Sequence, residues 1–346
     1  MRFLPLLLLL GCLGCDSRWL VNTRSEVALT TPINGNFTAN LAAGTPQGSI
    51  VPMPLGDSAT GKTSAKIALI DVDGLLVNQT LTGPLFVGDN PVALFQEKLD
   101  ATRADPTVCA VVVRINSPGG GVTACDIMRH LLERYRQTTG RPVIVCLVDV
   151  GAGGAYYVAT AADAIVAHPT TLTGGIGVIW NSYNLRDLMA QFNVIPQTVK
   201  AGNNIDMGTV NQAIPPETRK LLQQMADEYH QRFKSAVQAA RPSVDAKDET
   251  NFDGRVFTAS QALQRGLIDA AGYLEDAIEL AKQKSQQPKA SVVMYGRATN
   301  RALSSYVDTT NAIPTQSPLS IRMPGLERSR LPTFLYLWQP EPTLDR

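Results

Sequence analysis

Two glycine-rich turns hold the residues of this sequence with the clearest potential for chemistry. Residues 116–121 read Asn-Ser-Pro-Gly-Gly-Gly, and residues 149–157 read Asp-Val-Gly-Ala-Gly-Gly-Ala-Tyr-Tyr. Consecutive glycines let the backbone approach a ligand and direct N–H groups toward it. The second turn enters a predicted helix, whose amino terminus favours negative charge. The pair predicts an oxyanion hole for acyl chemistry in which Gly119, Gly120 and the N–H of Gly154 hold a carbonyl oxygen.

The elements that must position these turns alternate between buried strands and helices. Each turn follows a continuous apolar, β-branched run, as expected for a buried parallel strand. Strand–helix alternation at this spacing predicts an α/β fold of stacked βαβ units. We expect a strand and turn at 66–77 and strands at 108–115, 143–148 and 164–167, with 174–180 and 195–199 continuing the alternation. We expect helices at 91–103, 122–137, from about 154, at 215–240 and twice within 258–283.

Composition and charge exclude several classes of function. The 346 residues are 44% apolar, enough for a substantial core, and the formal net charge of +1 gives no basis for nucleic-acid binding. Cysteine and histidine do not occur at zinc-like spacing, so no metal or other cofactor is expected. We interpret Cys109, Cys125 and Cys146 as small core residues.

The amino-terminal segment 1–15 has the pattern of an export signal. Arg2 precedes a short apolar run, which is too short to span a bilayer as a helix. A small residue precedes each of Cys12 and Cys15, which is typical of a bacterial lipoprotein whose cysteine is lipidated. A plain cleaved secretory peptide is the alternative. We therefore expect an exported protein, anchored by lipid on the outer, periplasmic face of a bacterial membrane.

Residues 56–63 match the phosphate-loop pattern but lack its structural context. A phosphate loop needs a strand before it and a helix after it. The preceding residues 51–54 contain two prolines, and a predicted strand follows in place of a helix. We therefore predict no nucleotide binding at this segment.

From about residue 66 to 283 the chain resembles the signal peptide peptidase family of serine proteases. The resemblance rests on the run Arg114–Gly120 and on the segments 254–263 and 266–269. It implies a fold of the Clp protease and crotonase type, in which a spiral of βαβ units is joined to a mixed α/β carboxyl-terminal part. It also implies serine-type proteolysis of membrane-derived peptides.

Three family positions carry residues that cannot perform this chemistry. The second turn usually reads Asp-Val-Ala-Ala-Ser-Gly-Gly-Tyr-Tyr in the family, and its nucleophilic serine falls on Gly153. The lysine base of the family falls on Ile205, and a supporting serine falls on Gly175. The resemblance therefore implies a nucleophile and a base that this chain does not have.

Three functions remain open from the sequence. The favoured hypothesis is a non-catalytic peptide-binding or assembly subunit. The second is an active peptidase with a relocated dyad, for which Ser117, Thr171 and Lys200 are the candidates. The third, an acyl-CoA enzyme of the crotonase type, is disfavoured by the peptidase-like segment 254–269.

The domain organisation follows from the same patterns. After the signal we expect a polar linker at 16–63, a peptidase-like domain at 64–285 and a tail at 286–346. An apolar cluster in the tail, Phe334–Trp338, is interpreted as a packing strap or a contact to another subunit rather than a ligand site. The expected partners are peptides or membrane-protein segments, the membrane, and further subunits in a homo- or hetero-oligomer.

Lipidation gives a direct prediction for the amino-terminal cysteines. Changing both Cys12 and Cys15 to Ala should move the protein from the membrane fraction to the soluble secreted fraction, because the acyl chains that anchor it would be missing. Fractionation followed by immunoblotting measures this. An unchanged membrane partition would count against a lipid anchor.

Overall fold

The computed structural model describes residues 48–55, 64–80, 82–83, 86–297 and 334–338. The signal segment, with Cys12 and Cys15, and the phosphate-loop-like residues 56–63 lie outside these ranges. The strands are β1 (Ile50–Pro54), β2 (Lys66–Asp73), β3 (Thr82–Gly83), β4 (Phe86–Val87), β5 (Val108–Ser117), β6 (Gly119–Gly121), β7 (Val143–Ala152), β8 (Ala164–Ala167), β9 (Leu172–Gly174), β10 (Val256–Thr258), β11 (Ala270–Ala271), β12 (Ser291–Arg297) and β13 (Leu335–Leu337). The helices are α1 (Pro91–Ala104), α2 (Val122–Thr139), α3 (Gly154–Ala159), α4 (Arg186–Gln191), α5 (Pro216–Ala240), α6 (Ala259–Gln264) and α7 (Leu274–Lys284).

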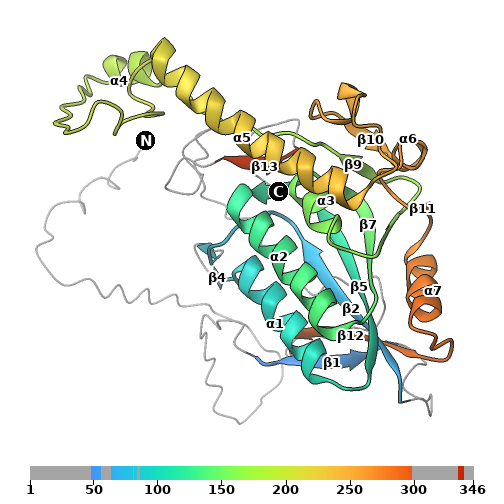
Figure 1. Cartoon of the computed structure of the whole chain (residues 1–346). Coiled ribbons are helices and arrows are strands. Elements are labelled where there is room, and N and C mark those ends of the chain that lie inside the picture. The colour runs from blue at the N-terminus through green and yellow to red at the C-terminus, as the bar shows by residue number, and fades with distance from the viewer. Residues whose placement is uncertain (1–47, 56–63, 81, 84–85, 298–333, 339–346) are drawn as a thin grey trace, which may run out of the picture. The chain divides into compact units, whose positions relative to one another are not determined.

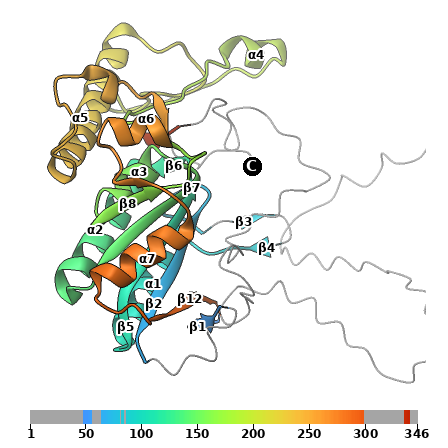
Figure 2. The same ribbon diagram turned by 90° about the vertical axis from the view of Figure 1, so that its right-hand side faces the viewer.

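A nine-stranded, mostly parallel sheet forms the centre of the structure (Figures 1 and 2). Its main path runs β1-β12-β2-β5-β7-β8-β11, and β9 joins it through β7 and carries β10. The pairs β2–β5, β5–β7 and β7–β8 are all parallel, as βαβ connections require. The α/β class and the succession of βαβ units predicted from the sequence are confirmed.

Side chains of the central strands alternate between two hydrophobic layers. Ala68 and Ile70 of β2 belong to the layer that α1, α2 and α3 cover, while Ile67 and Leu69 belong to the layer covered by α7. Both layers are fully buried in the central strands, which explains why these strands read as unbroken apolar runs. The carboxyl ends of β5 and β7 therefore lie at a common, rigidly supported edge of the sheet.

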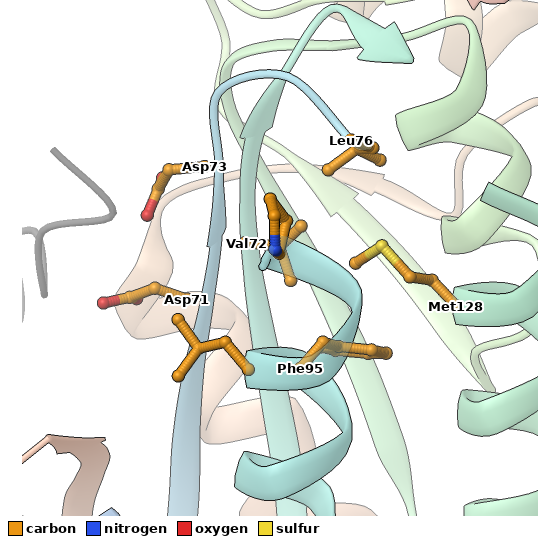
Figure 3. Close-up of a pocket in the computed structure, with 8 residues that line it drawn as sticks. Asp71, Val72, Asp73, Leu76, Phe95 and Met128 are labelled. Atoms are coloured by element: carbon orange, nitrogen blue, oxygen red, sulfur yellow. The ribbon is translucent and has the colours of Figure 1, made fainter. Parts of the chain in front are cut away.

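A buried charge cluster lies where β2 and β5 run side by side. Arg114 Nε and Asp71 Oδ1 are 2.9 Å apart, with side chains 5% and 0% exposed. The ammonium group of Lys98, on α1, donates to the Asp71 carbonyl oxygen at 3.1 Å, and burial lowers the pKa of Lys98. Asp71 and Asp73 point to one side of β2, away from Leu76 and Met128 (Figure 3).

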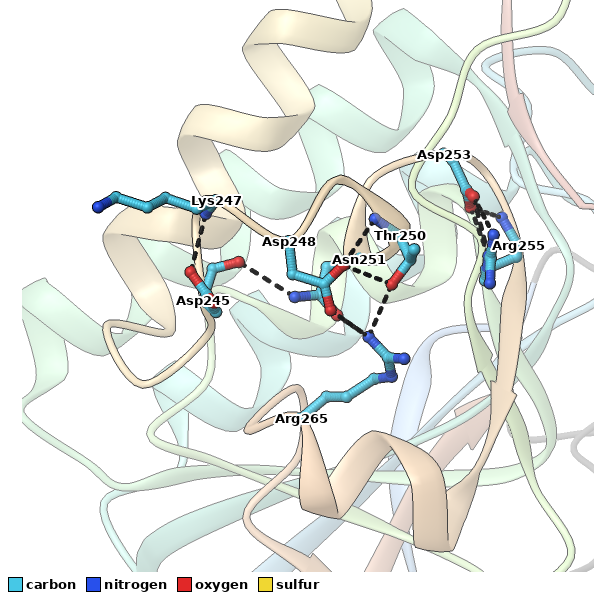
Figure 4. Close-up of polar contacts among 8 residues, drawn as sticks. All are labelled: Asp245, Lys247, Asp248, Thr250, Asn251, Asp253, Arg255 and Arg265. Atoms are coloured by element: carbon cyan, nitrogen blue, oxygen red, sulfur yellow. Dashed lines mark hydrogen bonds and ion pairs between the residues drawn. The ribbon is translucent and has the colours of Figure 1, made fainter.

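The segment from 245 to 265 is held by a local polar network (Figure 4). The guanidinium of Arg265 donates to Asp248 Oδ2, Thr250 Oγ1 and Asn251 Oδ1, at 3.0, 3.0 and 2.7 Å. Thr258 caps α6 in a reciprocal arrangement with Gln261. Arg265 also lies over the ring of Phe257 in β10, and β10 pairs antiparallel with β9, with Val256 opposite Gly174.

Several predicted boundaries need correction. Residues 50–54, assigned to the polar linker, form β1, because an edge strand tolerates prolines that a central strand excludes. Residues 291–297, assigned to the tail, form β12, which pairs with β2. The strand expected at 195–199 is wrong: these residues lie outside any strand, and Val199 is 99% exposed. The strand expected after the phosphate-loop-like segment is confirmed as β2.

The buried ion pair predicts a large loss of stability on one substitution. Arg114→Leu removes the guanidinium that faces the Asp71 carboxylate in the sheet, which should lower the free energy of unfolding by about 3–5 kcal/mol. Arg103→Leu breaks the exposed pair with Asp100 and should cost less than about 1 kcal/mol. Urea denaturation of both variants measures the difference. Equal losses would contradict the assigned role of the buried pair.

Candidate active site

The first glycine-rich turn forms β6 directly after β5. The main chain of Leu76 lies so close to Gly120 that a side chain at position 120 would overlap the carbonyl oxygen of Leu76. Leu76 N donates to Gly119 O, and Gly121 N donates to Leu76 O, both at 2.9 Å. Gly119 adopts a φ of 104°, a conformation that L side chains rarely adopt. The turn therefore requires glycine at 119 and 120 for reasons of space and backbone conformation.

The second turn links β7 to α3. Gly153 adopts a φ of 55° and a ψ of −126°, and its N–H donates to Gly174 O at 2.9 Å. A Cβ atom at 153 would lie 2.6 Å from the Tyr336 carbonyl oxygen and 3.0 Å from that of Pro118. At Gly154 a Cβ atom would overlap the Cys125 sulfur. The helix that follows has six residues.

The two turns meet around one carbonyl group, that of Tyr336. A Cβ atom at Gly119 would overlap this oxygen, and one at Gly154 would lie 3.1 Å from it. Tyr336 pairs with Gly120 in the antiparallel ladder between β13 and β6. We call Gly119, Gly120, Gly153 and Gly154 the glycine cradle. The structure thus brings together the three glycines that the sequence singled out for a carbonyl oxygen, with Gly153 beside them.

An aromatic pocket receives the side chain of Tyr336. Its ring centroid lies 5.2 Å from that of Tyr157 on α3 and 4.8 Å from that of Phe233 on α5. Its hydroxyl donates to the Tyr229 carbonyl oxygen at 2.7 Å. These aromatic residues were not predicted as site residues. The apolar face of the helix at 215–240, which carries Tyr229 and Phe233, was the available signal.

The position of Tyr157 in this pocket is stabilised by the carboxylate of Asp126, which also pairs with Arg232. Tyr157 Oη donates to Asp126 Oδ1 at 2.8 Å, and Arg232 donates to both oxygens of the same carboxylate. Burial, reinforced by the hydrogen bond to Asp126, raises the pKa of Tyr157 to about 12. The phenol therefore stays neutral at physiological pH and keeps the ring in place.

The structure does not bring together the two positions aligned with the family's nucleophile and base. Gly153 is buried in the cradle, while Ile205 is 73% exposed in the turn at 200–208. That turn lies with α4 at the end of α5 remote from α3 (Figure 1). Gly175 does lie beside Gly153, since a Cβ atom there would be 3.1 Å from Gly153 N.

The candidates for a relocated dyad have separate structural partners. Ser117 is buried, and its hydroxyl accepts from Gly119 N at 3.1 Å. Thr171 Oγ1 donates to Leu147 O at 3.0 Å. Lys200 Nζ bonds both carboxylate oxygens of Asp206 at 2.9 Å. Among the described residues, none of the three is hydrogen-bonded to another.

Cys125, which the sequence analysis interprets as a small core residue, is a thiol beside the cradle. Its sulfur lies against Gly154, and the residue is fully buried on α2. Burial raises the pKa of its thiol well above the usual value, so the thiol stays protonated. A buried neutral thiol is a poor nucleophile, and Cys125 acts here as a small packing group.

The apolar cluster of the tail needs a correction. Phe334, Leu335 and Tyr336 are buried, at 8%, 5% and 0% exposure, so the cluster does not offer an exposed surface for contact with another subunit. Of the two interpretations, the packing strap describes its position.

Within the described ranges, no group of three or more His, Cys, Asp or Glu residues could hold a metal ion. No helix in those ranges is long and apolar enough to cross a membrane.

Comparisons with known proteins show that the chain is similar to peptidases. The model of peptidase family S49 matches residues 135–288. The chain is 35% identical over 226 residues to the chloroplastic serine protease SPPA of Arabidopsis thaliana, covering 64% of this chain and 33% of that protein. It is 32% identical to the putative protease slr0021 of Synechocystis, covering 63% of this chain and 74% of the relative.

The matches cover only part of the longer relatives. The chain spans about a third of the plant protein and 36% of Protease 4 of Salmonella typhi, to which it is 31% identical. A solved structure of a mutant of the 1510-N membrane-bound stomatin-specific protease covers 66% of this chain and 97% of that one, at a TM-score of 0.42 and 13% identity. With a relative of which three quarters is covered at 32% identity, the chain belongs to peptidase family S49.

Proposed function

We propose that this chain is a non-catalytic member of its peptidase family that binds extended peptide segments or serves as an assembly subunit. The observation that supports it best is the glycine cradle itself. It surrounds a peptide carbonyl oxygen, that of Tyr336, and carries no side chain at the position aligned with the nucleophile. The cradle thus has what is needed to bind a peptide main chain and lacks what is needed to cut one.

The chemistry of acyl transfer makes this separation explicit. A serine peptidase attacks the carbonyl carbon with an activated hydroxyl and stabilises the resulting oxyanion with backbone N–H donors. Gly153 supplies no hydroxyl, and Ile205 has no titratable group to accept a proton. Cys125, the thiol beside the cradle, is buried and protonated. Without a nucleophile no oxyanion forms, so the backbone N–H donors of the cradle can bind a carbonyl oxygen but do not take part in cleavage.

The proposal extends to location and assembly. The signal-like segment with Cys12 and Cys15 supports a lipid-anchored protein on the outer, periplasmic face of a bacterial membrane, with peptides or membrane-protein segments as partners. Exposed apolar side chains support a homo- or hetero-oligomer. They gather in the segment from α4 to the turn at 200–208: Leu188, Phe192, Val194, Ile195, Val199 and Ile205. Exposed apolar groups of this density are typical of interfaces.

The catalytic part of the proposal predicts the absence of serine-type turnover. Purified wild-type protein should neither react with a fluorophosphonate probe nor cleave casein or a signal-peptide substrate, because no activated hydroxyl faces the cradle. In-gel fluorescence and mass spectrometry measure the two outcomes, with an active serine peptidase as positive control. Turnover that persists in Ser117→Ala and Lys200→Ala variants would show that the active site has been misassigned.

The assembly part predicts a mass above that of one 37.2 kDa chain in light scattering. Glu in place of Phe192 and Ile195 should shift the protein toward monomer, since buried charges are unfavourable at an apolar interface. Leu263→Glu changes an exposed apolar residue elsewhere and should leave the mass unchanged. A monomeric wild type at micromolar concentration would contradict self-association.

A further inference from the structure

A cavity of about 120 Å³ lies between the turn at 200–208 and the start of α5. This is the volume of about four water molecules at liquid density. None of the cradle glycines lines it. Both segments contribute polar groups to its lining: Lys200, Asn203, Asp206, Thr209, Gln212 and Thr218. The cavity therefore has room for a small polar molecule at a place separate from the glycine cradle.

The amino terminus of α5 offers hydrogen-bond donors at this cavity. Pro215, the N-cap, makes no side-chain cap, and Pro216 has no N–H. The N–H groups of Glu217 and Thr218 precede the first bond of the helix, which runs from Arg219 N to Pro215 O at 2.9 Å. Pro215 and Thr218 both line the cavity. Free N–H groups and the helix dipole favour an anionic group at this end.

Thr218 is a buried residue whose hydroxyl has no protein partner within the described ranges. The residue is 9% exposed and lines the cavity, and its hydroxyl forms no hydrogen bond with any residue that the structure describes. Because the side chains of a helix lean toward its amino terminus, that of Thr218 is directed at the cavity. A buried hydroxyl without a partner is unfavourable, so an acceptor in the cavity would be stabilised by it. Thr218 and the helix N–H groups together indicate a site for a carboxylate.

The turn at 200–208 contributes two charges that compensate each other. Lys200 Nζ lies 2.9 Å from both carboxylate oxygens of Asp206, and Gln212 Nε2 donates to one of them at 3.2 Å. The hydrogen bond from Lys200 lowers the pKa of Asp206, so this carboxylate is ionised at neutral pH. Glu217, the acidic residue in the first turn of α5, is exposed and does not line the cavity. The charges of the lining therefore sum to zero, which favours a ligand without net charge over a simple anion or cation.

We propose that this cavity binds a small zwitterion of the α-amino acid class. The carboxylate of the ligand accepts hydrogen bonds from the start of α5 and from the hydroxyl of Thr218. The ammonium group of the ligand donates to Asp206. Lys200, whose side chain is 40% exposed, is free to turn from Asp206 toward the carboxylate of the ligand. Glycine and L-alanine have the size that the volume of the cavity allows.

Saturation-transfer NMR on the full chain tests this proposal, with L-alanine as the probe. L-alanine should bind the wild type with a dissociation constant in the millimolar range, as expected for so small a ligand. Acetate and methylammonium, which each carry only one of the two charged ends, should bind at least about tenfold more weakly. Acetate binding as tight as that of L-alanine would overturn the proposal. The absence of saturable L-alanine binding up to about 50 mM would overturn it too.

Two substitutions in the lining test where the ligand binds. Thr218→Val keeps the shape of the side chain but removes the hydroxyl, and it should weaken L-alanine binding by about tenfold. Asp206→Asn should also weaken L-alanine binding but strengthen that of acetate, because Lys200 loses its carboxylate partner. Asp227→Asn is the matched control and should change neither affinity. It alters an exposed carboxylate of α5 that accepts from Gln223 and does not line the cavity.

Unchanged L-alanine binding by Thr218→Val would place the ligand elsewhere and contradict the proposal. Circular dichroism of each variant verifies that the fold is intact. If Asp206→Asn does not fold, Thr218→Val decides the question alone, since valine and threonine have nearly the same shape. Neither measurement depends on peptide binding or on serine-type turnover, so failure of this proposal and failure of the proposed function are distinguishable.

Discussion

The organisation of the site depends on the close approach of main chain to main chain at Gly119, Gly120 and Gly153. A side chain at Gly119 or Gly120 would overlap a carbonyl oxygen, that of Tyr336 or Leu76. At Gly153 it would lie 2.6 Å from the Tyr336 oxygen. This constraint is steric, and it holds whether or not the site performs chemistry. Glycine at these positions is therefore required by the packing of the main chain, independently of any chemistry.

The sheet makes this approach possible. Parallel strands buried on both faces fix the ends of β5 and β7 at one edge, and the ladder through Ser117 and Gly151 continues to the start of the second turn. Strand β9, which pairs parallel with β7, supplies Gly174, whose carbonyl accepts from Gly153 N. Strand β10 pairs antiparallel with β9, and Arg265 lies over the ring of Phe257 in β10. Strands β5 and β10, which are more than 100 residues apart in the sequence, are thus linked through β7 and β9 beside Gly153.

The central elements could be predicted because their sequence signals are local. The apolar runs at 108–115 and 143–148 and the periodicity of 215–240 each report burial directly. β1 was missed because prolines at 52 and 54 resemble a linker, although an edge strand accepts them. The role of β13 could not be predicted, since its pairing with β6 spans more than 200 residues and three apolar residues in a row indicate burial without indicating a partner.

The candidate site, like the fold, could be predicted from the sequence only in part. Gly119, Gly120, Gly153 and Gly154 could be located from the sequence because consecutive glycines mark close approach. The pocket of Tyr157, Tyr229 and Phe233 could not, because its residues read equally well as core. The alignment of Ile205 with the family's base follows from the sequence alone. The exposure of Ile205 in the turn at 200–208 depends on the tertiary placement of that segment, which the sequence does not reveal.

Hydrogen exchange of the main chain tests the central claim most directly, namely that the glycine cradle holds a peptide main chain and that in this protein it is the chain's own. The amides of Leu335 and Trp338 donate to Ile179 O and Pro118 O, whereas Val199 is almost fully exposed. In the wild type, the first two should exchange at least about 100-fold more slowly than Val199, relative to their intrinsic rates. Exchange of Leu335 and Trp338 as fast as that of Val199 would show an empty cradle and contradict the account.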